Sequence, residues 1–84
     1  SPGLSSDGSK IAAIYNDPNL EHQIHILDTK GIKIDQINVP MNYYPCYPKF
    51  IENDQKIAYT IRNDKSEMAL LTYHISDKTT EVII

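Results

Sequence analysis

Apolar and polar positions alternate with a period of two along several short stretches of the chain, and this pattern predicts β-strands. Ile57, Tyr59 and Ile61 alternate with other residues, and so do Ile24 and Ile26. Such alternation places apolar side chains on one face of a strand. The strands expected from these runs cover residues 2–5, 10–15, 22–28 and 32–37, then 46–51, 57–61, 68–75 and 80–84.

Turn-forming residues separate the expected strands. Gly8 stands where a positive φ is expected, and Asn53 and Asp54 occupy the matching place in the second half, since these residue types tolerate the left-handed region. Tight hairpin turns are expected at 28–31 and 76–79. Between Ile34 and Ile37 the apolar positions change phase, which predicts a β-bulge.

The most informative feature is an internal repeat. The segment PGLSSDGSKIAAI at 2–14 returns as PKFIENDQKIAYT at 48–60, an offset of 46 residues. A repeat of this length in a β-rich chain is typical of propeller blades. Ile11 and Ile57 should therefore occupy equivalent buried positions, and so should Leu4 and Phe50. The turn at 76–79 aligns with the turn at 28–31 at an offset of 48, which predicts two additional residues in the second repeat near 62–66.

These signals predict an all-β chain made of two four-stranded antiparallel propeller blades, over residues 1–39 and 40–84. The segment LSSDGSKIAAI resembles the TolB-type (WD40-like) propeller repeat, and QIHILD at 23–28 is similar to the third strand of that repeat. The resemblance implies a fragment of a TolB-like β-propeller in the periplasm or another extracytoplasmic compartment. Two places depart from the family pattern: Ser6 replaces its usual proline, and ENDQ at 52–55 replaces its SPDG.

The resemblance implies a non-catalytic repeat protein that serves as a scaffold for binding a protein or peptide. Two alternatives stay open. The chain could form part of the gating propeller of a prolyl-oligopeptidase-like peptidase, with the hydrolase domain elsewhere. It could instead belong to the sensory domain of a membrane-anchored transcriptional regulator.

Composition argues against several classes of partner and site. The 84 residues carry a net charge of −3, with eight basic residues scattered among acids, whereas nucleic-acid binding requires clustered Lys and Arg. No apolar run reaches the roughly 18 residues that a membrane-spanning helix needs. The single cysteine, Cys46, excludes an internal disulfide and a Cys-based zinc site. We expect it to fill space as a small apolar residue.

The sequence contains no pattern that points to catalysis, a metal or a cofactor. His22 and His25 lie three residues apart, which on a strand sends them to opposite faces. Serines, histidines and aspartates are present, but no Gly-x-Ser-x-Gly motif fixes a nucleophile. Asp7, Asp54 and Asp77 lie in expected turns, where aspartate is common for structural reasons.

A cluster of tyrosines gives the best candidate for a binding surface. The long connection at 38–45 should share one end of the molecule with the connections at 16–21 and 62–66, and binding residues concentrate on such loops. Alternatively, the tyrosines fill the seam between the two blades, a place that suits Tyr47 best. The candidate binding residues are Asn16, Asn42, Tyr43, Tyr44, Tyr47 and Arg62.

Two blades alone should leave two apolar outer faces open, because a propeller blade is covered on both sides by its neighbours. The run at 68–75 has apolar residues in both phases of the alternation, as a strand buried on both faces requires. We therefore expect either that the segment belongs to a longer propeller, whose remaining blades cover these faces, or that it self-assembles into a closed ring.

Overall fold

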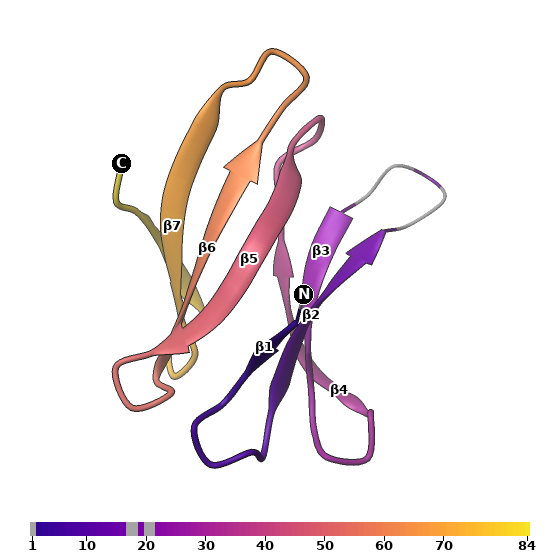
Figure 1. The fold of residues 1–84 in the computed structure, drawn as a ribbon, viewed down its shortest axis with the longest axis vertical. Coiled ribbons are helices and arrows are strands. Elements are labelled where there is room, and N and C mark those ends of the chain that lie inside the picture. Colours follow the sequence, from indigo (N-terminus) through magenta and orange to yellow (C-terminus); the bar gives the residue numbers. More distant parts are fainter. Residues whose placement is uncertain (1, 17–18, 20–21) are drawn as a thin grey trace.

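The chain folds into two four-stranded antiparallel sheets in a computed structural model that describes residues 2–16, 19 and 22–84 (Figure 1). No helix occurs in those residues. This confirms the all-β fold class and the two blade-like sheets. The first sheet contains β1 (Gly3–Leu4), β2 (Ile11–Asn16), β3 (His22–Leu27) and β4 (Lys33–Asn38). The second contains β5 (Tyr44–Ile51), β6 (Lys56–Arg62), β7 (Met68–His74) and β8 (Thr79–Val82).

The pairing register repeats at an offset of 46 through both sheets. Leu4 pairs with Ile11 in the first sheet, and Phe50 pairs with Ile57 in the second. The same offset continues beyond the first two strands, because the pairs of β2 with β3 all return as pairs of β6 with β7. The prediction of two additional residues near 62–66 is therefore wrong: the connections 17–21 and 63–67 have equal length.

The offset of 48 between the later turns reflects a β-bulge instead, which lies at Ile34, just before the predicted place between Ile34 and Ile37. Ile26 pairs with Asp35 and Leu27 pairs with Lys33, so Ile34 is an additional residue in β4. The second sheet reaches the same register without it, since Thr72 pairs with Glu81. The bulge shifts the position of the hairpin turn, while the pairing register of β3 with β4 before the bulge stays equivalent to that of β7 with β8.

Strand β5 begins earlier than expected and contains two prolines. Pro45 and Pro48 are both buried, and β5 is the edge strand of its sheet, where a missing N–H does not break a central ladder. A second bulge lies between Cys46 and Lys49. Tyr47 occupies that bulge with a φ of 54°.

The turns have the expected chemistry. Gly8 has a φ of 74°, and Asn53 and Asp54 have φ values of 58° and 64°. In the first turn the Asp7 carboxylate accepts hydrogen bonds from the hydroxyl and the backbone N–H of Ser9, at 2.7 and 2.9 Å. These bonds, with one from the Ser5 hydroxyl, lower the pKa of Asp7 to about 2.

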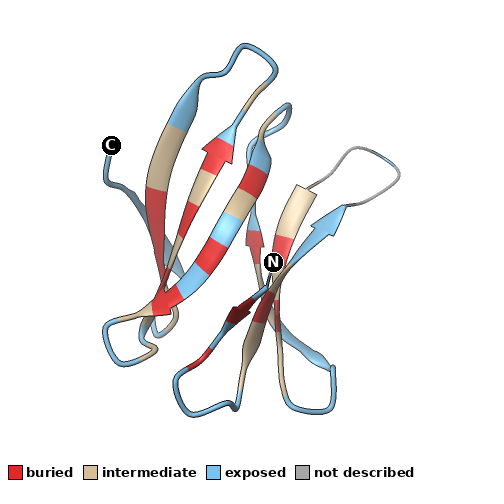
Figure 2. Cartoon of the chain, viewed as in Figure 1, coloured by how far each residue is buried: buried red, intermediate tan, exposed pale blue. Residues whose placement is uncertain are grey.

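A single apolar cluster lies between the two sheets (Figure 2). The first sheet contributes one face, and the second contributes residues of β5, β6 and β7. Gly3 allows β1 to approach β5 closely, because a Cβ at this position would collide with the carbonyl oxygen of Pro48. The cluster consists of Ala12, Ile24, Ile26, Ile37, Phe50, Ile57, Tyr59, Ile61, Leu71 and Tyr73.

The two sheets bury opposite faces, which corrects the prediction of equal burial at equivalent positions. Ile57 is fully buried and Phe50 is 8% exposed, whereas Leu4 is 64% exposed and Ile11 is only half-buried. The face that contains Ile57 packs on the first sheet. The equivalent face of the first sheet points away from the second, as it does in successive repeats stacked in one direction.

Polar contacts also join the sheets. The Tyr73 hydroxyl donates a hydrogen bond of 2.7 Å to the Asp35 carboxylate, and Lys78 Nζ lies 3.2 Å from the other carboxylate oxygen. Burial alone would raise the pKa of Asp35, but these donors and the Gln36 N–H together lower it. The pKa of Tyr73 is raised by its burial and by this carboxylate. Nearer the first turn, the Ser6 hydroxyl donates to Asp54 at 2.6 Å.

Equivalent isoleucines should differ in their contribution to stability. Ile57→Ala should lower the free energy of unfolding by about 2–4 kcal/mol, because it leaves a cavity in the core between the sheets. Ile11→Ala should cost about 1 kcal/mol, since that side chain is only partly removed from water. Urea denaturation of both variants measures the difference, and equal losses would show that the two faces are buried alike.

The Tyr73→Phe variant should lower the free energy of unfolding by about 1.5–3 kcal/mol at pH 7, because a hydrogen bond to a carboxylate is lost. Asp35 has a lowered pKa in the fold, so its contribution is present above about pH 4 and is lost as the pH falls through the folded-state pKa. The pKa is lowered less in the variant. The difference between wild type and variant should therefore narrow from pH 7 to pH 3.

Urea denaturation at both pH values tests this, with Tyr47→Phe as a matched control. Tyr47 is 77% exposed, so losing its hydroxyl should change stability by less than about 0.5 kcal/mol. A loss for Tyr73→Phe that is the same at pH 7 and pH 3 would contradict the role given to Asp35.

Candidate functional site

One end of the molecule carries the connections 39–43 and 63–67, together with the end of β2 and the start of β3 (Figure 1). We call it the loop end. The expectation that the long connections share one end is met for these residues; the part of the predicted 16–21 connection at residues 17–18 and 20–21 lies outside the described residues.

A chain of side-chain contacts crosses from one sheet to the other at the loop end. Asn16 Oδ1 lies 2.8 Å from His22 Nδ1. The His22 ring meets the Tyr44 ring at a centroid distance of 4.7 Å, and the Tyr44 hydroxyl donates to Asp64 at 3.3 Å. Asn16 and Tyr44 were predicted from the sequence. His22, which links them, and Asp64, which ends the chain of contacts, were not.

The other predicted residues lie apart from this chain of contacts. Asn42 is exposed and has a φ of 72°. Tyr43 is half-buried against the core, and Arg62 is exposed at the end of β6. Tyr47 is 77% exposed, so it does not fill the seam between these two sheets. Of the tyrosines in this connection, Tyr43 packs on the core and Tyr44 touches the first sheet.

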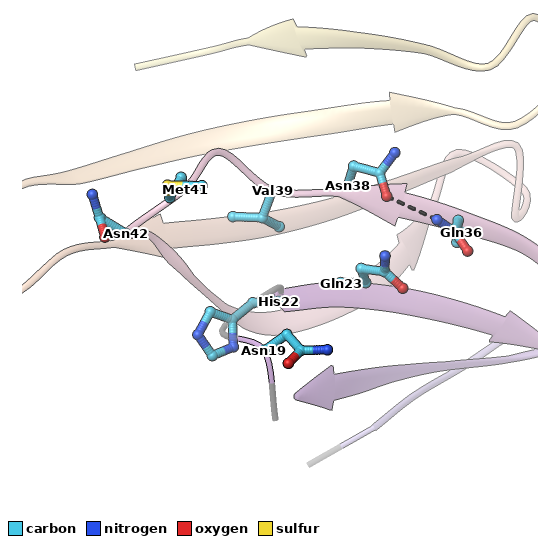
Figure 3. A pocket seen from close by; sticks show the side chains of 8 residues that line it. All are labelled: Asn19, His22, Gln23, Gln36, Asn38, Val39, Met41 and Asn42. Atoms are coloured by element: carbon cyan, nitrogen blue, oxygen red, sulfur yellow. Dashed lines mark hydrogen bonds between the residues drawn. The ribbon is translucent and has the colours of Figure 1, made fainter. Parts of the chain in front are cut away.

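A hollow of about 540 Å³, lined mostly by residues with polar side chains, opens beside His22, between the start of β3 and the connection that follows β4 (Figure 3). His22, Val39 and Met41 contribute to its wall. The rest of the lining consists of carboxamide side chains, from Asn19, Gln23, Gln36, Asn38 and Asn42.

Hydrogen bonds fix several of these carboxamides. Gln36 Nε2 donates to Asn38 Oδ1 at 2.8 Å, and Lys33 Nζ donates to Gln36 Oε1 at 2.6 Å. Gln23 Oε1 lies 2.7 Å from His25 Nε2. The register places Gln23 opposite Asn38 and His25 opposite Gln36, all on the face of the first sheet that points away from the second.

His25 also stacks on Tyr15, with ring centroids 4.4 Å apart. Its pKa is lowered by burial and by the nearby charge of Lys33, so the ring favours the neutral form. The stack and the carboxamides together make this part of the open face a continuous polar surface.

The polar surface corrects the expectation of two apolar outer faces. The half of the first sheet's open face that lies away from the loop end is apolar, with Leu4, Ile11 and Leu27. The half at the loop end is polar. A signal for this difference was present in the sequence, in the comparison of the two repeats. At an offset of 46, Gln23, His25, Gln36 and Asn38 stand where the second repeat has Ala69, Leu71, Val82 and Ile84.

No group of three or more His, Cys, Asp or Glu side chains gathers as a metal site within the described residues. His22 contacts Tyr44 while His25 stacks on Tyr15, in keeping with their predicted placement on opposite faces. Cys46 is half-buried, with its thiol 3.8 Å from the Tyr44 carbonyl oxygen. None of the described segments forms a helix long and apolar enough to span a membrane.

Comparison of the chain with models of protein families, with curated proteins and with solved structures finds no match.

Proposed function

We propose that the chain is a non-catalytic two-blade segment of a TolB-like β-propeller, acting outside the cytoplasm as a scaffold that binds a protein or peptide at its loop end. The observation that carries the proposal is the repeated register combined with packing in one direction. One face of the second sheet rests on the first sheet, and the equivalent face of the first is open. Because unlike faces meet in this packing, no symmetry closes it at two sheets, and a further sheet can be added in the same direction.

The open face of the second sheet supports the addition of a further sheet. Leu70 and Ile83 stand where the first sheet has the buried Ile24 and Ile37. A shallow apolar hollow of about 320 Å³ lies on this side, lined by Thr60, Met68, Ala69, Leu70 and Ile84. Met68 and Ile84 are 64% and 81% exposed. Exposed apolar surface of this kind marks an interaction site.

The occupant that we propose is a sheet whose docking face resembles the one that the second sheet already uses. Glu81 takes the place of Asp35 in the register, so a tyrosine equivalent to Tyr73 would find a carboxylate there. Lys49 takes the place of Gly3, where close approach between sheets is needed. A neighbouring sheet that packs in the same way therefore needs a residue without a side chain at position 49.

A tandem chain tests the proposal. Residues 39–84 are repeated directly after Ile84, which keeps the spacing of 46, and Lys49→Gly provides room for the added β-strand. The third sheet should cover the open face of the second and raise its stability. We expect slower hydrogen exchange of amides in β6 and β7, by at least tenfold, and a single cooperative unfolding transition.

The matched controls are the 84-residue chain with Lys49→Gly alone and the tandem chain with an additional Leu70→Lys. Leu70→Lys places a charge in the new interface and should remove the gain in protection. If the added repeat unfolds separately and β6 and β7 exchange as in the 84-residue control, the open face is not a stacking surface and the proposal is wrong.

A further inference from the structure

We propose that the carboxamide-lined hollow at the loop end binds an extended, uncharged peptide segment by its main chain. The inference rests on the proposed peptide-binding function and specifies its site and ligand class. It starts from the polar half of the first sheet's open face, where an apolar neighbour is disfavoured. Gln36 and Asn38 lie there on β4, and Gln23 lies opposite Asn38 on β3.

The spacing of the carboxamides matches an extended main chain. Gln36 and Asn38 occupy alternate positions of β4, so their side chains leave the same face about 6.6–6.8 Å apart. Peptide groups on one side of an extended ligand repeat at the same distance. A peptide lying along β4 can therefore meet both side chains in one register.

The chemistry of the lining selects a peptide group. A carboxamide carries both an acceptor oxygen and two N–H donors, so it can pair with the N–H and the C=O of a main chain together. Gln36 Nε2 donates one of its N–H groups to Asn38 Oδ1, and Gln36 Oε1 accepts a hydrogen bond from Lys33 Nζ. The second N–H of Gln36 and the amide nitrogen of Asn38 supply donors for a ligand, and the second lone pair of Gln36 Oε1 and of Asn38 Oδ1 can accept from a ligand N–H.

The lining also argues for an uncharged ligand. No Asp, Glu, Lys or Arg lines the hollow among the residues that the structure describes. The closest cation in the hydrogen-bond network, Lys33 Nζ, is held by Gln36 Oε1. Val39 and Met41 add apolar surface for small side chains of the ligand. Burying a charged side chain here would leave it without a partner of opposite charge.

Fluorescence anisotropy on the 84-residue chain tests the inference. The probe is acetyl-Ser-Ala-Thr-Ala-Ser-Ala-amide carrying an uncharged dye, competed with the unlabelled peptide. We expect saturable binding that the unlabelled peptide reverses. The same peptide with every backbone nitrogen methylated should bind at least tenfold more weakly, because the main-chain donors of both edges are removed. Maltotriose should not compete.

Substitutions locate the site. Gln36→Met and Asn38→Leu keep the approximate shape of each side chain and remove its carboxamide. Each should weaken binding by about tenfold. Gln55→Met is the matched control, because Gln55 is an exposed residue in the turn between β5 and β6 at the opposite end, and it should leave binding unchanged.

Three results would overturn the inference: no saturable binding, equal binding of the methylated peptide, or displacement by maltotriose, which would indicate a saccharide site. Binding that Gln36→Met and Asn38→Leu leave within twofold would also overturn it. The methylated peptide is tested on the wild-type chain, so the outcome does not depend on how the variants fold. None of these results bears on whether a third sheet stacks in the tandem chain, so the two proposals can fail separately.

Discussion

The structure depends on one constraint: among the described residues, all the buried side chains of the apolar core lie in a single layer between two sheets that present opposite faces to each other. Each sheet alone would leave that layer in water, so neither half has a core of its own. The Asp35–Tyr73 hydrogen bond stands within this layer and joins β4 to β7. Removing either sheet would expose the buried face of the other.

The open faces of the two sheets differ, so the two ends of the stack are not equivalent. The second sheet keeps an apolar open face, with Leu70 and Ile83 at positions that are buried in the first sheet. The first sheet's open face is apolar only near Leu4 and Ile11, and it becomes polar toward the loop end. The two ends of the stack therefore differ in chemistry: one suits another sheet, and the other suits a polar ligand beside the stacking surface.

Much of the fold could be predicted from the sequence, because the alternation of apolar and polar residues and the internal repeat can be recognised without knowing how the sheets pack. The 46-residue repeat predicts that Leu4 and Ile11 correspond to Phe50 and Ile57, and the two pairs occupy equivalent places in their sheets. Burial could not be predicted in the same way. Two identical positions differ in exposure when one face is covered and the other is not, and only the packing of the sheets decides this.

The candidate site was predicted less well. Asn16 and Tyr44 were found through their place in long connections, but His22, which joins them, reads in sequence as an ordinary strand histidine. The carboxamides Gln36 and Asn38 likewise look like polar positions of an exposed strand. Their meaning emerges only when the second repeat is aligned with the first, where Val82 and Ile84 stand in their places.

Static light scattering of the 84-residue chain carrying Lys49→Gly, over a range of concentrations, tests the central claim most directly. If the sheets stack in one direction and the second sheet's open face is a docking surface, the apparent mass should rise above the roughly 9.6 kDa of one chain as concentration increases, because the substitution removes the side chain that blocks close approach. Adding Leu70→Lys should return it to the mass of one chain. A Lys49→Gly chain that stays monodisperse at the mass of one chain up to high concentration would contradict the account.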